Sequence, residues 1–118
     1  MLARRIPLAP PPAYEVRFHA AFIDEIAAHP HAEALLEEIA HDLAISEKHL
    51  RRGAVTKVAS KHGVDLWRFK PNTDHAIRIL YSPQGNVREV VMAIPRSTDY
   101  RASDLDAAIG RILGLKDF

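Results

Sequence analysis

The sequence contains no cysteine among its 118 residues. This absence excludes a disulfide framework, a thiolate metal site and a cysteine nucleophile, and it is typical of proteins in the reducing cytosol. No apolar run approaches the roughly 20 residues that a membrane span needs. The segment after Arg4 and Arg5 is short and broken by proline, so a secretory signal is not expected. We therefore expect a cytoplasmic protein that does not enter a membrane.

Glycine-rich phosphate-binding motifs are also missing. The five glycines form neither a P-loop nor a Rossmann fingerprint, and no Ser-His-Asp arrangement stands in a recognisable context. Seven histidines are present, but none has a strong ligand pattern with carboxylates; His29 and His31, for example, merely flank a proline. The sequence thus predicts no metal site and no cofactor.

The charges that are present are unevenly distributed. Residues 1–50 hold four Lys/Arg and eight Asp/Glu, a net −4, whereas residues 51–101 hold ten and four, a net +6. Residues 102–118 hold two and three, a net −1, so the whole chain carries only +1. A basic block of this kind is the electrostatic footprint of a protein that meets a polyanion.

The first half of the chain predicts an arm, a strand and two helices. Residues 1–13 contain four prolines and are expected to form an extended arm, followed by a single domain over residues 14–118. Residues 14–19 alternate like a half-buried strand, and residues 20–28 have apolar positions at helical spacing. Residues 32–43 follow the amphipathic pattern most closely. Ser46 is a candidate cap for a further short turn.

The second half predicts an antiparallel meander and a last helix. Residues 51–63 are ambiguous between a loop and a short helical or extended element. Three β-type runs follow at Leu66–Lys70, Ala76–Tyr81 and Val87–Ile94, joined by tight turns. The last run is nearly all apolar, which favours a central strand covered on both faces. A helix begins at Ser103 and is expected to stop at Gly114.

Basic side chains recur on this meander. Strict alternation places Leu66, Arg68 and Lys70 on one face of the first strand, and Trp67 and Phe69 on the core face. The later strands contribute further groups, so that one concave surface is predicted to gather Arg68, Lys70, Arg78, Arg96 and Tyr100. Such a surface is suited to bind phosphate.

These residue types fit the cleavage of RNA without a metal. The reaction must remove a proton from the 2′-hydroxyl, stabilise a pentavalent phosphate and protonate the 5′-oxygen. Arginine binds phosphate oxygens bidentately, a lysine among arginines has a lowered pKa, and a tyrosine can stack on a base or assist proton transfer. Lys70, Arg78, Arg96 and Tyr100 are the predicted catalytic set.

Each member also has an ordinary structural explanation. Arg68 and Lys70 would be the solvent face of an edge strand, where lysine deters aggregation. Arg78 would pair with an acid such as Asp65 or Glu89, Arg96 would be a loop arginine, and Tyr100 would anchor the last helix. The site hypothesis depends on all of them meeting on one meander.

The ordered set of motifs resembles the RelE/ParE toxin superfamily. The matching features are a strand with alternating basic residues, an Arg-x-x-Tyr strand, a strand leading to an arginine, and a tyrosine before the final helix. In this chain they are Leu66–Lys70, Ile77–Tyr81, Val90–Arg96, Tyr100 and the helix through Ala108–Ile112. The likeness covers roughly residues 14–112.

The resemblance implies an α+β, microbial-RNase-like fold of order β-α-α-β-β-β-α, with a twisted antiparallel sheet of about four strands packed on helices. It implies that Arg78 and Arg96 stabilise phosphate, with Lys70 and Tyr100 beside them, and that Arg68 and Lys70 are basic groups that bind RNA. We also predict that Arg51 and Arg52, in the same basic block, bind RNA. Members of the RelE branch are ribosome-dependent mRNA endonucleases that need no metal and are neutralised by an antitoxin in a hetero-oligomer. The expected partners are therefore a cognate antitoxin, the ribosome and mRNA.

Two alternatives remain open. ParE-like members share the fold but poison DNA gyrase and lack the nuclease residues. A non-catalytic protein would use the same basic face to bind nucleic acid or a partner, because one scaffold hosts several functions.

Overall fold

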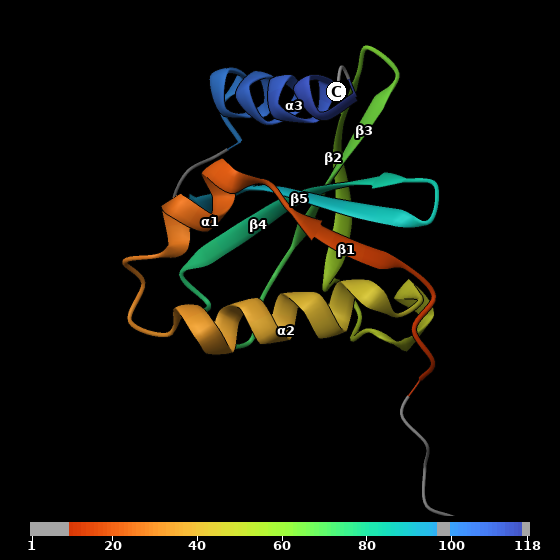
Figure 1. Cartoon of the computed structure of the whole chain (residues 1–118), viewed down its shortest axis with the longest axis vertical. Helices are drawn as coiled ribbons and strands as arrows, with labels where there is room; N and C mark the ends of the chain where they lie inside the picture. The colour runs from red at the N-terminus through yellow and green to blue at the C-terminus, as the bar shows by residue number, and fades with distance from the viewer. Residues whose placement is uncertain (1–9, 97–99, 117–118) are drawn as a thin grey trace, which may run out of the picture.

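A computed structural model describes residues 10–96 and 100–116. Figure 1 shows a mixed sheet with helices on both of its faces. In chain order the elements are β1 (Glu15–Phe18), α1 (Ala20–Ile26), α2 (Ala32–Ala44), the 3-10 turn η1 (Glu47–His49), β2 (Val55–Lys61), β3 (Val64–Phe69), β4 (Ile77–Gln84), β5 (Val87–Pro95) and α3 (Ala102–Lys116).

The sheet has five strands in the order β1-β5-β4-β3-β2. Strands β2 to β5 form an antiparallel meander, and β1 joins its far edge parallel to β5, with Glu15 opposite Val87. The predicted α+β class is therefore confirmed. The expectation of about four antiparallel strands was wrong in two respects, because β2 is a fifth strand and the β1–β5 pair is parallel.

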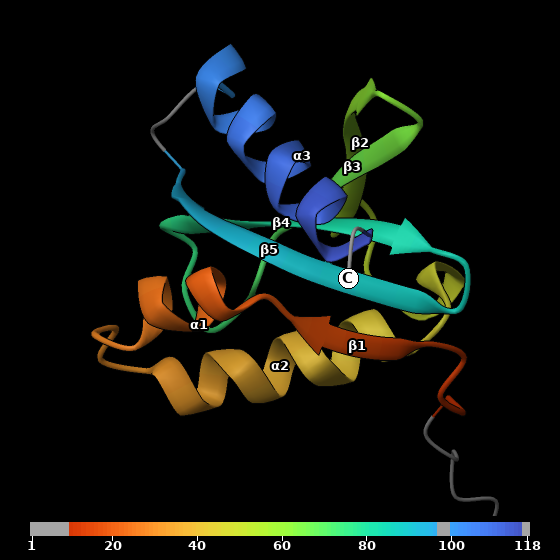
Figure 2. The ribbon, with the colours of Figure 1, turned by 45° about the horizontal axis from the view of Figure 1, so that its top comes forward.

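Two hydrophobic cores lie on opposite faces of the sheet. Helices α1 and α2 cover one face through Phe22, Leu35 and Ile39, which pack with Phe69 and Tyr81 of the sheet. Helix α3 covers the other face, as Figures 1 and 2 show, and its buried residues include Ala108, Ile109 and Ile112. Both faces of β5 are therefore covered, as its apolar sequence predicted.

The alternation in β3 has the predicted register. Phe69 is fully buried in the core under α1 and α2, and Trp67 packs against the same core. Leu66 is fully buried on the opposite face, in the core under α3. Arg68 follows the period of two and shares that face, where it meets Tyr100.

Strand β2 occupies the segment for which the sequence was ambiguous. It forms a hairpin with β3 through His62 and Gly63, both at positive φ (56° and 73°). A bulge between Lys57 and Ala59 interrupts the pairing, so the side-chain alternation changes phase inside the strand. That change removes the period-two pattern by which a strand is recognised.

The chain ends of the domain show smaller differences. Helix α3 continues through Gly114 to Lys116, so the predicted stop at Gly114 was wrong. The predicted arm lies outside the described residues up to position 9; Pro10–Pro12 have no regular structure, and the amide of Ala13 donates to the carbonyl of Ala44 at 2.7 Å. Within residues 10–96 and 100–116, no helix is long and apolar enough to span a membrane.

Candidate functional site

Lys70 follows the last residue of β3, and its backbone is held on both sides. Its amide donates to the carbonyl of Ala54 at 2.9 Å, and its carbonyl accepts a hydrogen bond from the guanidinium of Arg51. Positive charge surrounds the side chain. Arg68 is the largest influence that lowers the pKa of Lys70, followed by partial burial and then by Arg78, Arg96 and Arg51. Five cationic side chains from four parts of the chain therefore lie near one another: Arg51, Arg68, Lys70, Arg78 and Arg96.

Arg68 connects this group to Tyr100. Its Nη1 donates to the Tyr100 hydroxyl at 3.3 Å, and its Nη2 donates to Thr56 Oγ1 of the neighbouring strand β2 at 3.0 Å. Its Nε is buried and has no hydrogen-bond partner in the described part of the chain. The guanidinium is thus fixed in place between a strand neighbour and an aromatic hydroxyl.

Arg78 projects from β4 and bends back onto its own backbone. Its Nη1 donates to the carbonyls of His75 at 3.1 Å and Ile77 at 2.8 Å. Burial is the main cause that lowers the pKa of Arg78, and Arg96 and Arg68 add to it. A guanidinium remains charged under such influences, so Arg78 is a partly desolvated fixed cation.

The acids proposed as ordinary partners of Arg78 are engaged elsewhere. Asp65 accepts from Lys57 at 3.2 Å, and Glu89 lies 3.7 Å from Arg17. Among the described residues, no carboxylate lies within 4.0 Å of the Arg78 guanidinium.

Arg96 and Tyr100 complete the group from the far end of β5. The amide of Arg96 donates to the carbonyl of Ala76 at 2.7 Å, which places Arg96 beside the start of β4. Its side chain is exposed. Tyr100 packs its ring against the core under α3 while its hydroxyl meets Arg68, so it both anchors the helix and reaches the cations.

We call these six residues the cationic cluster: Arg51, Arg68, Lys70, Arg78, Arg96 and Tyr100. Every predicted site residue belongs to it except Arg52, which is exposed on the turn before β2 and is not among the charges that act on Lys70. Other arginines differ clearly. Arg88 pairs with Glu47 at 3.1 Å, and Arg111 pairs with Glu25 at 2.9 Å. Over the described ranges, no member of the cluster has such an ion pair.

Sequence reasoning missed Thr56 and the carbonyl of Ala54, which hold Arg68 and Lys70. Thr56 belongs to the unrecognised strand β2, and Ala54 immediately precedes that strand. The signal that was available is the pair Ala54-Val55 before a polar stretch, which is too short to identify an edge strand.

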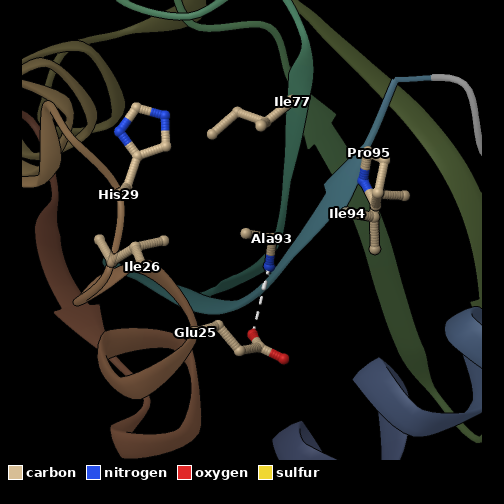
Figure 3. Close-up of a pocket in the computed structure, with 7 residues that line it drawn as sticks. All are labelled: Glu25, Ile26, His29, Ile77, Ala93, Ile94 and Pro95. Atoms are coloured by element: carbon tan, nitrogen blue, oxygen red, sulfur yellow. Dashed lines mark hydrogen bonds between the residues drawn. The ribbon is translucent and has the colours of Figure 1, made fainter.

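A separate pocket of about 200 Å³ lies between α1 and the adjoining ends of β4 and β5 (Figure 3). It is lined by Glu25, Ile26, His29, Ile77, Ala93, Ile94 and Pro95. Its polar groups are already used: Glu25 pairs with Arg111, and His29 pairs with Asp74. The pocket shares no lining residue with the cationic cluster. No group of three potential metal ligands was found among the residues that the structure describes.

The fold is similar to that of a solved toxin–antitoxin structure. A chain in the crystal structure of the archaeal RelE–RelB complex from Pyrococcus horikoshii OT3 superposes with a TM-score of 0.55 and 23% sequence identity, over 74% of this chain and 99% of that one. No family model matches the sequence, and no curated protein matches it. The RelE-type fold that the motifs predicted is confirmed.

Proposed function

We propose that this protein is a RelE-like toxin that cleaves mRNA on the ribosome without a metal. The cationic cluster is the single observation that carries the proposal. It combines a lysine of lowered pKa, four arginines and a tyrosine, and its members form no ion pair to a carboxylate among the described residues. Such a site has charge available for a phosphate that enters it.

In the proposed reaction, the neutral Lys70 amine removes the proton from the ribose 2′-hydroxyl. The 2′-oxygen attacks the phosphorus, the bond from phosphorus to the 5′-oxygen breaks, and a 2′,3′-cyclic phosphate forms. Arg78 and Arg96 stabilise the extra negative charge on the pentavalent phosphate. Tyr100 gives its proton to the leaving 5′-oxygen, and Arg68 stabilises the phenolate through the Nη1–Oη contact. Exchange with water returns both groups to their starting states.

The geometry supports these roles in different ways. Arg78 is held by a rigid strand and by two carbonyls, as an electrostatic stabiliser requires. Lys70 is crowded by cations, which favours its neutral form. Arg51 and Arg68 extend the positive surface toward the β2 side and would contact neighbouring phosphates; Arg52 is proposed as an outer RNA contact only.

The partners follow from the same proposal. The neighbouring structure contains RelE with RelB, and we propose that this chain likewise assembles with a small antitoxin that covers the cationic cluster. A negatively charged or helical antitoxin segment over the cluster would neutralise it by excluding mRNA.

The proposal is tested by incubating the purified protein with ribosomes programmed with a defined mRNA. We expect cleavage of the mRNA on the ribosome in the presence of a chelator that removes transition metals, with a 2′,3′-cyclic phosphate and a 5′-hydroxyl at the new ends. Intact mRNA together with inhibition of DNA supercoiling by gyrase would instead support the ParE-like alternative. RNA binding without either activity would support a non-catalytic protein.

A further inference from the structure

The loop between β3 and β4 lies between Lys70, the proposed base, and Arg78, the proposed phosphate stabiliser. Residues 71–76 connect Lys70 to the start of β4, whose second residue is Arg78, so the conformation of this loop sets where the amine lies relative to the guanidinium. Six residues without regular structure would by themselves be mobile. In this protein, helix α2 holds the loop from outside the cationic cluster.

Glu38 of α2 makes this connection. Its two carboxylate oxygens accept hydrogen bonds from consecutive backbone amides of the loop, Asn72 at 2.5 Å and Thr73 at 2.8 Å. Glu38 is adjacent to Ile39, which is fully buried in the core, so the carboxylate sits on a rigid support. Charge-assisted bonds of this type are among the stronger hydrogen bonds in proteins.

The electrostatics of Glu38 show that its charged form is favoured where it sits. Partial burial is the largest influence on Glu38 and acts to raise its pKa, but the bonds from Asn72 and Thr73, together with Arg51, outweigh it, and the pKa is lowered. The carboxylate is therefore ionised at neutral pH. It faces both the loop and the arginine that holds the Lys70 carbonyl.

A second contact fixes the far end of the same loop. Asp74 accepts from the His29 ring at 2.6 Å and from the amide of Ala76 at 2.7 Å. With Lys70 tied to Ala54 and Arg51, the loop is held at its start, middle and end. Glu38 holds the middle through two adjacent backbone amides.

We propose that Glu38 is a positioning residue for RNA cleavage, which holds the β3–β4 loop so that Lys70 and Arg78 face one phosphate. This inference rests on the proposed nuclease function. Glu38 does not touch the substrate; it acts through the loop backbone. Neither the alternating basic residues nor the motif before the last helix points to it.

The test compares Glu38→Gln with the matched control Glu37→Gln. Glutamine keeps the size of the side chain but puts an N–H donor where one of the loop amides needs an acceptor, whereas Glu37 is exposed on the same helix. We expect the Asn72 and Thr73 amides of Glu38→Gln to exchange with solvent about tenfold faster or more. The control should exchange like the wild type.

NMR titration of the Lys70 amine shows whether its pKa rises or falls in Glu38→Gln. The direction distinguishes a movement of the amine from the loss of a nearby negative charge. If Glu38 holds Lys70 among Arg51, Arg68, Arg78 and Arg96, its loss lets the amine move away, and the Lys70 pKa rises toward the ordinary lysine value. A purely electrostatic effect of losing a nearby negative charge would lower that pKa instead. The Glu37→Gln control should leave it unchanged.

Cleavage kinetics complete the test. Misplacement of a catalytic group by about 1 Å costs on the order of 10²-fold, so Glu38→Gln should lower the single-turnover rate by about 10- to 100-fold with little change in half-saturating ribosome concentration. In a Lys70→Ala background the same substitution should have almost no further effect, because the group that it positions is gone.

The proposal would be overturned if the loop amides of Glu38→Gln exchanged at the wild-type rate and its Lys70 titrated as in the wild type. It would also be overturned if Glu38→Gln caused its full rate loss in the Lys70→Ala background. Both NMR measurements are independent of activity. If the wild type cleaves no RNA but Glu38→Gln still frees the loop and raises the Lys70 pKa, then the role of Glu38 in holding the loop stands and the nuclease function is the part that fails.

Discussion

At the scale of single residues, the behaviour of Lys70 depends on its neighbours. The ammonium form is disfavoured by Arg68 first, then by partial burial and by three further arginines, so the amine loses its proton at a lower pH than an ordinary lysine. If the neutral amine is the base, the cleavage rate must rise with pH and level off above the lowered pKa. The protonation state of Lys70 therefore depends on the arginines around it.

We therefore predict that the single-turnover cleavage rate rises with pH around a midpoint below that of a free lysine. Raising the salt concentration toward 1 M shortens the screening length to about 3 Å and weakens the repulsion, so the midpoint should move to higher pH. Lys70→Ala should remove this rise of the cleavage rate with pH. If the rise persists in Lys70→Ala, another group is the base.

The guanidinium of Arg78 gives the second residue-scale prediction. Arg78→Ala should lower the cleavage rate by on the order of 10²-fold or more while the melting temperature changes little, because the proposed role of this side chain is to stabilise the transition state. Arg78→Lys should restore only part of the rate, since an ammonium lacks the bidentate fork. Arg17→Ala, which removes an exposed cation of β1 that is not among the charges acting on Lys70, is the control. Wild-type cleavage by Arg78→Ala would place the site elsewhere.

Some of the site could be predicted from the sequence, and the reason differs from residue to residue. Arg68 and Lys70 were placed by a strict period of two in a strand with a regular pleat. Arg51 could not be linked to Lys70 in this way, because their contact is a guanidinium on a backbone carbonyl across a loop. The role of Glu38 could not be predicted for the same reason, because it binds backbone amides and every residue type except proline has one.

At the scale of elements, the packing of the chain determines strand direction and pairing, which the sequence pattern does not. The alternation of residues 14–19 predicted β1 but not its direction, since parallel and antiparallel strands share the same period. Helices α1 and α2 carry the chain across one face of the sheet, from β1 at one edge to β2 at the other, and β1 pairs with β5 in parallel (Figure 2). Strand β2 was missed because its bulge changes the phase of the alternation, and because an edge strand carries polar residues on much of its length.

Helix α2 provides a stability prediction. Ile39 is fully buried between the helix and the sheet, so Ile39→Ala should lower the free energy of unfolding by about 2–5 kcal/mol through lost burial and a cavity. Glu37→Ala on the exposed side of the same helix should cost less than about 0.5 kcal/mol. Urea denaturation measures both losses, provided that the free energy of unfolding depends on urea concentration with the same slope in each variant. A loss below 1 kcal/mol for Ile39→Ala would show that the core under α2 is not tightly packed.

At the scale of the whole molecule, charge is segregated along the chain. The net −4 of residues 1–50 falls largely on α1 and α2, and the net +6 of residues 51–101 falls on the meander that carries the cationic cluster. Charge is therefore divided unevenly between the elements, although the total is only +1. Such asymmetry orients a protein toward a polyanion without strong attraction over its whole surface.

The last prediction concerns the whole protein in a cell. Induced expression of the chain alone should arrest growth and reduce protein synthesis within a few generations, because one catalytic toxin destroys many messages. The doubly substituted Lys70→Ala, Arg78→Ala protein, expressed at an equal soluble level, should permit growth, since it keeps the fold but loses the proposed base and a phosphate stabiliser. Pulse labelling of protein and DNA distinguishes the alternatives: loss of translation first supports mRNA cleavage, whereas loss of replication first supports action on gyrase. Normal growth with abundant soluble wild-type protein would contradict both toxin functions and leave the cationic cluster as a binding surface.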